Sequence, residues 1–124
     1  MNCLIVDDEL MSQNVMKHLV SQIDFLNLIG TCSSGVEALN VLNREKADLI
    51  LLDVEMPGMS GLEFIKSLNS SPLVILATSK KEYAIEAFEC NVVDYLVKPI
   101  AIDRFFKAIA KAKENSYRPN SWQC

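Results

Sequence analysis

The sequence predicts an α/β fold, a doubly wound parallel sheet with helices on both faces. Short apolar runs of β-type residues recur along the chain, and most are apolar throughout. Unbroken apolar runs are typical of strands that are covered on both faces. The segments between them place apolar residues at helical spacing. Strands that alternate with helices imply right-handed crossovers and therefore a parallel sheet.

Five strands are expected. They share short length and β-branched or leucine-rich composition, and they cover Cys3–Val6, Leu28–Cys32, Leu49–Leu52, Leu73–Ala77 and Tyr95–Val97. Each is followed by a segment with helical character, so the chain contains five βα units. We find no internal repeat and no low-complexity tract.

The first expected helix covers Leu10–Ile23. Two adjacent rows of apolar residues lie on one side of it. The first row is Met11, Val15 and Leu19, and the second is Met16, Val20 and Ile23. Its other side is polar, which is the pattern of a helix packed on a core.

The remaining helices follow from caps and stops. Ser34 and Glu37 fit a capping box that opens the second helix, which runs to about Asn43. The third covers Leu62–Leu68, where "NSSP" stops it, and the fourth covers about Glu82–Cys90. The fifth begins near Ile102, with a stripe made by Ile102, Phe105, Phe106 and Ile109.

Size and charge limit the function. With 124 residues, of which 50% are hydrophobic, the chain is long enough for one globular domain and too short for two. A net charge of −4 argues against DNA contact by this segment alone. No signal peptide precedes the first strand, and no apolar run approaches the roughly 18 residues that span a bilayer. We expect a soluble cytoplasmic protein without membrane contact.

The four cysteines are Cys3, Cys32, Cys90 and Cys124. They lie too far apart for metal-ligand spacing, and a disulfide framework belongs to smaller secreted chains. We interpret them as buried or incidental thiols in a reducing cytosol.

The residues that follow the strands predict a site. In doubly wound folds, ligands bind beyond the carboxyl ends of the strands. The first strand is followed by Asp7, Asp8 and Glu9, and the third strand by Asp53. The fourth strand is followed by Thr78, and the fifth by Lys98. Three aspartates at one rim suit a hard cation, most plausibly Mg²⁺. Lys98 offers a compact positive charge from the opposite side.

These groups predict phosphoryl transfer. A hydroxyl, a lysine, a metal ion and a carboxylate together stabilise a transferring phosphoryl group. A carboxylate can itself be the nucleophile and form an aspartyl phosphate. Asp53 is the best candidate because it ends the apolar strand "LILLD" and precedes the turn-rich loop "MPGMSG".

The chain resembles a receiver domain of bacterial two-component response regulators. The matching motifs are "VDDE", "LLDVEMPGMSG", "LAT" and "DYLVKP", in that order, and the resemblance extends from Met1 to about Lys113. It implies a flavodoxin-like sheet of strand order 2-1-3-4-5, a receiver domain over residues 1–115, and a tail or linker over residues 116–124. The segment "YAIEAFECNVVDYLVKPI" resembles receivers that precede a LytTR-type DNA-binding domain.

The resemblance also implies roles at the site. Asp53 would accept a phosphoryl group from the phosphohistidine of a cognate sensor histidine kinase. Asp8, Asp53 and the main-chain carbonyl of Glu55 would ligate Mg²⁺, while Asp7 would act through metal-bound water. Lys98 would pair with the phosphoryl oxygens.

Two further residues would form the switch. Thr78 would bond to the new phosphate and draw its loop inward, and Tyr95 would change rotamer to fill the space. Each alone would be an ordinary strand-end hydroxyl or core aromatic. The Lys98–Pro99 bond matches a position that is commonly cis in this family.

The implied function is a phosphoacceptor switch, not a turnover enzyme, that catalyses its own phosphorylation and dephosphorylation. It would control transcription through an output domain that this chain lacks, and DNA would be bound only by that domain.

The open alternatives are a stand-alone receiver that signals by protein contact, and a small aspartyl-phosphate phosphatase. Haloacid-dehalogenase-like phosphatases place a second aspartate two residues after the nucleophile, where this chain has Glu55. A flavin-binding module is disfavoured because the carboxylates would repel the cofactor's phosphate.

His18, the only histidine, shares a polar helix side with Asn14 and Ser21, so we interpret it as solvated and not as a phosphoryl donor.

Two charged stripes predict a dimer. Glu82, Glu86 and Glu89 fall at helical spacing on the fourth helix, and Arg104, Lys107 and Lys111 do so on the fifth. In a two-fold dimer the same patch meets itself, so adjacent stripes of opposite sign are self-complementary. We expect phosphorylation to promote a homodimer through these helices. The alternative is that the stripes are solvated or pair within one chain.

Overall fold

The predicted doubly wound fold is confirmed. The computed structural model describes residues 1–68, 72–80, 82 and 84–116, with only the backbone described at positions 86 and 88. Five parallel strands form one sheet in the order β2-β1-β3-β4-β5. The strands are β1 (Asn2–Val6), β2 (Asn27–Cys32), β3 (Leu49–Leu52), β4 (Leu73–Thr78) and β5 (Asp94–Val97).

The helices connect successive strands. They are α1 (Leu10–Ser21), α2 (Gly35–Arg44), α3 (Gly61–Ser67), α4 (Ala84–Glu89) and α5 (Ile102–Asn115). The predicted bounds hold to within two residues where they are described. The predicted start of the fourth helix at about Glu82 can be compared only in part, because residues 81 and 83 lie outside the described residues.

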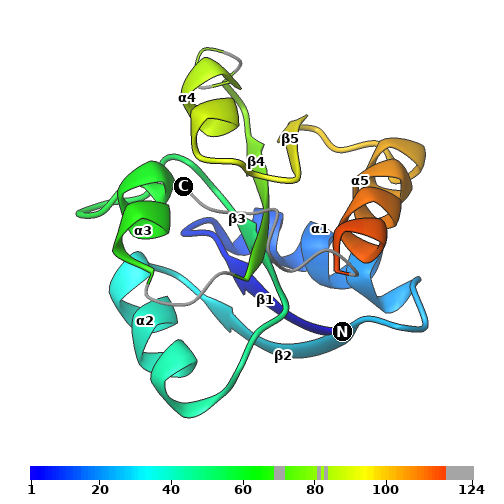
Figure 1. Ribbon diagram of the computed structural model, residues 1–124, viewed down its shortest axis with the longest axis horizontal. Coiled ribbons are helices and arrows are strands. Elements are labelled where there is room, and N and C mark those ends of the chain that lie inside the picture. The colour runs from blue at the N-terminus through cyan, green and yellow to red at the C-terminus, as the bar shows by residue number, and fades with distance from the viewer. Residues whose placement is uncertain (69–71, 81, 83, 117–124) are drawn as a thin grey trace.

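The sheet separates two apolar layers because strand side chains alternate between faces. Leu4 and Val6 of β1 join one cluster with residues of α2, α3 and the end of α4. Cys3 and Ile5 join the other, with residues of α1 and α5. Figure 1 shows α1 and α5 together on one side of the sheet and α2 and α3 on the other.

Two predicted apolar stripes are only partly buried. On α1, Met16, Leu19 and Val20 are buried, but Met11 is 82% exposed and Val15 is 50% exposed. On α5, Phe105 and Ile109 are buried, whereas Ile102 and Phe106 are exposed. The stripes are wider than the strip of helix surface that contacts the sheet, so their margins face outward.

The starts of α2 and α3 are capped by side chains, whereas those of α1 and α5 are not. The Ser34 hydroxyl accepts a hydrogen bond from the Glu37 amide, but the Glu37 carboxylate accepts from the amide of Ser33 and not from that of Ser34. The predicted box at α2 is therefore half formed. A full capping box stands at α3, where Ser60 and Glu63 bond reciprocally.

Three cysteines are confirmed as buried thiols that form no disulfide: Cys3, Cys32 and Cys90. Cys124 lies outside the described residues. His18 is exposed on α1, as predicted. In the described part of the chain, no helix combines the length and the apolar character needed to cross a membrane.

Candidate functional site

Three aspartates meet at the carboxyl edge of the sheet. Asp7 and Asp8 follow β1 and Asp53 follows β3, and these strands are adjacent, with Val6 paired to Leu52. One carboxylate oxygen of each aspartate lies within 4.8 Å of the others. Asp7 and Asp53 are buried, with 0% and 5% of their surface exposed, and Asp8 is exposed. The sequence prediction of an acidic cluster is confirmed in its geometry.

Lys98 supplies the positive charge of this cluster. Its Nζ lies 2.8 Å from Oδ2 of Asp7, 3.5 Å from Oδ2 of Asp53 and 3.8 Å from Oε1 of Glu9. It also donates to the Ser12 hydroxyl at 3.1 Å. Burial lowers the pKa of Lys98, but the hydrogen bond to Asp7 and the surrounding carboxylates outweigh it, so the pKa of Lys98 is raised. The ammonium group is fully charged at neutral pH.

Asp53 is the carboxylate whose acidity the site changes most clearly. Burial raises the pKa of Asp53 from 3.8 to about 6. Lys98 and the hydrogen bond from the Glu55 amide lower this pKa, while Asp7 and Asp8 raise it further. One cation does not fully compensate the carboxylates around Asp53, so the site favours an additional positive charge.

The loop after β3 places Asp53 against α3. The Glu55 amide donates to Oδ1 of Asp53 at 3.1 Å, and the Gly61 amide donates to the carbonyl of Val54 at 2.7 Å. A Cβ on Gly61 would lie 2.4 Å from the carbonyl oxygen of Asp53, which is closer than any side chain permits. Only glycine allows α3 to begin this close to Asp53.

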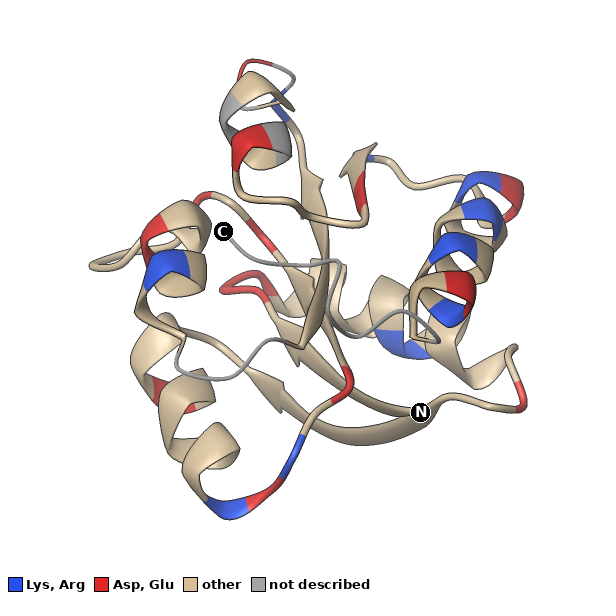
Figure 2. Ribbon diagram, in the orientation of Figure 1, with Lys and Arg blue, Asp and Glu red and all other residues tan. Residues whose placement is uncertain are grey.

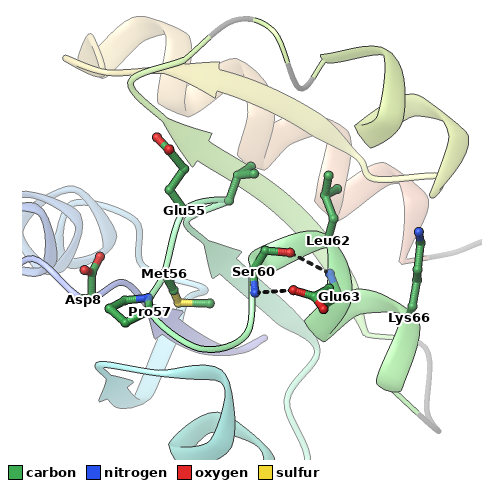
Figure 3. A pocket seen from close by; sticks show the side chains of 9 residues that line it. Asp8, Glu55, Met56, Pro57, Ser60, Leu62, Glu63 and Lys66 are labelled. Carbon is green, nitrogen blue, oxygen red and sulfur yellow. Dashed lines mark hydrogen bonds between the residues drawn. The ribbon is translucent and has the colours of Figure 1, made fainter.

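A cleft of about 570 Å³ opens beside this loop, and Asp8 and Glu55 lie at its acidic end. Its other lining residues are Val54, Met56, Pro57, Ser60, Leu62, Glu63 and Lys66. Figure 3 shows Met56 and Pro57 lying between Asp8 and the start of α3, with the reciprocal Ser60–Glu63 bonds at the opposite end. The cleft gives solvent and ligands access to the exposed carboxylate of Asp8.

The predicted switch residues lie on the neighbouring strands. Thr78 is buried at the end of β4, and its hydroxyl accepts a hydrogen bond from the Lys80 amide at 3.4 Å. Tyr95 on β5 donates its hydroxyl proton to the carbonyl of Lys80. The Lys80 side chain lies 3.4 Å from Glu55, so the segment after β4 contacts both the β3 loop and Tyr95. The Lys98–Pro99 bond is cis, as the resemblance implied.

The basic stripe of α5 is partly neutralised within the chain. Arg104 forms two hydrogen bonds to the carboxylate of buried Asp94, at 2.7 and 2.8 Å, and Lys111 donates a third at 3.2 Å. Figure 2 shows the blue segments of α5 and the red segment at the start of β5. Of the three predicted basic residues, Lys107 is exposed and has no ion pair among the described residues.

The acidic stripe of α4 does not have its predicted form. The helix covers Ala84–Glu89, so Glu82 precedes it, and the Glu86 side chain lies outside the described residues. Glu82 instead lies 3.8 Å from Lys80.

Sequence reasoning missed three residues of the site. Ser12 and Gln13 had no role in the sequence interpretation, yet Ser12 contacts Lys98 and Gln13 is buried with only 7% of its surface exposed. Gly61 appeared only within a turn-rich motif. Gln13 and Ser12 follow the acidic motif by one helical turn, and this spacing was the available signal.

The arrangement fits Mg²⁺. Hard oxygen donors, two of them buried and mutually repelling, are ligands that this ion prefers, and the exposed side of Asp8 leaves room for the water ligands that it keeps. The chemistry of the donor set is the same as that inferred from the sequence.

Comparison with known proteins identifies matching families and folds. The family model of the response regulator receiver domain matches residues 3–110 of the sequence. The positive alginate biosynthesis regulatory protein of Pseudomonas aeruginosa is 39% identical over 99% of this chain and 50% of its own length. An uncharacterized response regulatory protein of Shewanella oneidensis is 38% identical over 91% of this chain and 49% of its own. The chain therefore spans about half the length of the curated relatives it matches.

Solved structures agree. The response regulatory domain of protein mrkE from Klebsiella pneumoniae superposes with a TM-score of 0.87 at 27% identity, covering 95% of this chain and 99% of that one. The response regulator TrrA from Thermotoga maritima, solved in complex with Mg²⁺ and BeF, superposes with a TM-score of 0.79 at 28% identity, covering 90% and 97%.

Proposed function

The chain belongs to the response regulator receiver domain family, and from this premise we propose that Asp53 accepts a phosphoryl group in a Mg²⁺-dependent reaction. The observation that carries the proposal is the convergence of Asp7, Asp8 and Asp53 with Lys98 at one edge of the sheet. Among these carboxylates, Asp53 combines burial, contact with the lysine and a place at the end of a central strand.

The roles follow from the contacts. An oxygen of the ionised Asp53 carboxylate attacks phosphorus, the new O–P bond forms, and the bond from phosphorus to the donor's nitrogen breaks with its electron pair going to the nitrogen. Above its pKa of about 6, Asp53 is in the nucleophilic form. The Glu55 amide holds Oδ1 of Asp53, while Oδ2 faces Lys98. Lys98 can pair with the phosphoryl oxygens.

Mg²⁺, when bound, would neutralise the charge on the phosphoryl oxygens. We propose that Asp8, Asp53 and the main-chain carbonyl of Glu55 hold it and that Asp7 acts through a bound water. The complex of the Thermotoga maritima relative with Mg²⁺ and BeF supports this assignment by analogy. Both oxygens of Asp7 already accept hydrogen bonds, from the Glu9 amide and from Lys98, which favours an indirect role for this residue.

We further propose that Thr78 and Tyr95 transmit the phosphorylated state. Both bond to Lys80, so a movement of Thr78 toward a phosphoryl group would disturb the contact between Tyr95 and the Lys80 carbonyl. This route leads from the site to β5, and it supports our proposal that the chain acts as a switch.

For the whole protein we propose a cytoplasmic transcription regulator that a sensor histidine kinase phosphorylates. The match to the alginate biosynthesis regulator is compatible with the LytTR-type interpretation. We propose residues 1–115 as the receiver and residues 116–124 as a tail or linker, of which 117–124 lie outside the described residues.

Labelling with acetyl phosphate and Mg²⁺ tests the proposal. Intact mass spectrometry is expected to show one added phosphoryl group in the wild type and none in Asp53→Asn, with Asp24→Asn as the exposed control. Equal labelling of Asp53→Asn contradicts the assignment. Multiple turnovers with small phosphate esters, in place of stoichiometric labelling, would support the phosphatase alternative.

A homodimer through α4 and α5 remains a second proposal. Exposed apolar residues favour it: Ile85, Val97, Ile102 and Phe106 are between 36% and 75% exposed. Because Arg104 and Lys111 pair with Asp94 in the same chain, Lys107 is the basic residue that the proposal now depends on. Sedimentation of the wild type and Lys107→Glu, with and without beryllofluoride, tests it. An activated wild type that stays monomeric, or a charge reversal without effect, contradicts it.

A further inference from the structure

The amide of Gln13 is the buried polar group that the proposed chemistry leaves unexplained. Gln13 lies on the first turn of α1 with 7% of its surface exposed. Its Nε2 donates to the carbonyl of Asp7 at 2.6 Å and to the Ser33 hydroxyl at 3.2 Å, and lies 3.5 Å from the carbonyl of Cys32. Glutamine is mostly exposed in proteins, and a buried polar side chain is stable only when its polar atoms form hydrogen bonds.

The bond to Asp7 fixes one particular peptide unit. The carbonyl of Asp7 and the amide of Asp8 belong to the same planar group. Holding that carbonyl therefore fixes the last backbone dihedral of Asp7 and the first of Asp8. These angles set the directions in which both carboxylates leave the chain.

The other contacts anchor this peptide to the neighbouring strand. The amide of Asp7 donates to the carbonyl of Cys32 at 2.9 Å, and Gln13 bonds to Ser33 on the same turn. The Ser33 amide in turn donates to the carboxylate of Glu37 at the start of α2. The Asp7 backbone is thus held on one side by the last residue of β2 and on the other by Gln13, which itself bonds to the turn after β2.

Side chains alone would not hold Asp8 in the same way. Asp7 has its carboxylate fixed by the Glu9 amide and by Lys98. Asp8 is exposed. Among the described residues, its carboxylate accepts no hydrogen bond and forms no ion pair. Its direction depends on the backbone, and the backbone at this point depends on Gln13.

We propose that Gln13 is a positioning residue for the metal ligands, which holds the Asp7–Asp8 peptide so that both carboxylates are directed to the Mg²⁺ position before the ion binds. Mg²⁺ requires nearly ideal octahedral geometry, so a ligand pair that must first be ordered binds it more weakly. Outer-shell partners of this kind typically contribute about 10- to 100-fold in metal affinity. This inference rests on the Mg²⁺ site of the proposed function.

The test titrates the folded protein with Mg²⁺ at constant temperature and measures the Mg²⁺ concentration at the midpoint of the shift of its amide NMR signals. Gln13→Met keeps an unbranched side chain of similar size and removes both donors, and Gln13→Asn keeps the amide but shortens its reach. We expect the midpoint to increase about ten-fold in Gln13→Met and by a smaller factor in Gln13→Asn. Both variants are measured without any phosphodonor.

Two controls separate positioning from stability. Gln22→Met makes the same change at the exposed residue that caps the C-terminus of α1 and is expected to leave the midpoint unchanged. Val20→Ala removes buried apolar atoms of α1 and is expected to lower the melting temperature in the absence of metal without moving the midpoint. A purely structural Gln13 would behave as Val20 does.

The outcomes distinguish the two proposals. If neither the amide signals nor the melting temperature of the wild type respond to Mg²⁺, the proposed metal site itself is contradicted. A responsive wild type with an unchanged midpoint in Gln13→Met overturns only the positioning role. If Gln13→Met does not fold, the midpoint of Gln13→Asn decides, since an unchanged value there also overturns the role.

Discussion

Lys98 and Asp7, which are 91 residues apart in the sequence, meet as an ion pair with 2.8 Å between Nζ and Oδ2. Asp7 has no exposed surface, whereas 15% of the Lys98 side chain is exposed. The buried carboxylate therefore depends on this one lysine for compensation. The pair connects the ends of β1 and β5, which among the strands that contribute to the site lie farthest apart in the sheet.

Replacing Lys98 by methionine is expected to destabilise the protein by about 3 kcal/mol, because a buried carboxylate loses its partner. Adding Asp7→Asn in the same chain removes the uncompensated charge and is expected to restore part of the loss. Urea unfolding of the two single variants and the double variant measures the coupling. Lys107→Met, at an exposed position, should change stability by less than about 0.5 kcal/mol. A double variant less stable than Lys98→Met contradicts this account.

Asp53→Asn is expected to make the metal-free protein more stable at neutral pH by about 1 to 2 kcal/mol. The folded state raises the pKa of Asp53 from 3.8 to about 6. The contribution of Asp53 to stability is therefore complete below pH 3.8 and is lost as the pH rises through about 6. The advantage of the asparagine variant should be near zero in acid and reach its plateau above that range.

Unfolding curves between pH 4 and pH 8, in the presence of chelator, test the Asp53 prediction. Asp24→Asn, at an exposed position of the chain, serves as the control for removing one negative charge. Mg²⁺ should narrow the difference because it stabilises only the wild-type carboxylate. An asparagine variant that is less stable at every pH would show that Asp53 is compensated by its neighbours.

Gly61→Ala is expected to cost about 1 to 3 kcal/mol and to slow the phosphorylation of Asp53. The added Cβ would lie 2.4 Å from the Asp53 carbonyl oxygen and 2.9 Å from Cα of Val54, so backbone has to move. Gly30→Ala is the matched control, because its Cβ would meet only Leu4 Cδ1 at an ordinary 3.5 Å. Chemical denaturation and the labelling rate measure both effects, and equal behaviour of the two variants would refute the close-approach argument.

Arg104→Met is expected to destabilise the protein by about 1 to 2 kcal/mol at pH 7, with Lys111 still bonded to Asp94. Burial raises the pKa of Asp94. The hydrogen bonds from Arg104, the Tyr95 amide and Lys111 lower this pKa by more than burial raises it, so the net shift is downward. The stability from this carboxylate is present above its ordinary pKa of 3.8 and is lost as the pH falls through the lowered value. The cost of Arg104→Met, followed by urea unfolding, should therefore decrease in strong acid. A cost that is independent of pH would assign it to lost packing.

The elements were predictable because apolar runs and caps act locally. All five strands and the strand order agree with the prediction, and so do the three aspartates and Lys98, since parallel strands deliver their last residues to one edge. The burial of Gln13 was not predictable, because it depends on carbonyls at the ends of β1 and β2, which only the fold brings together. The sequence left open whether the basic stripe pairs within one chain, and only the fold shows that Arg104 and Lys111 both pair with Asp94.

The two apolar layers each contain a thiol that can serve as an independent reporter of local opening. Cys3 belongs to the layer under α1 and α5, and Cys32 belongs to the layer under α2 and α3. Burial raises the pKa of the Cys3 thiol to about 12 and that of Cys32 to about 11, so neither forms the reactive thiolate while the chain is closed. When reclosing is faster than alkylation, the alkylation rate at each position is proportional to the fraction of time for which its own layer is open, so the two rates compare the opening of the two faces of the sheet in a single sample.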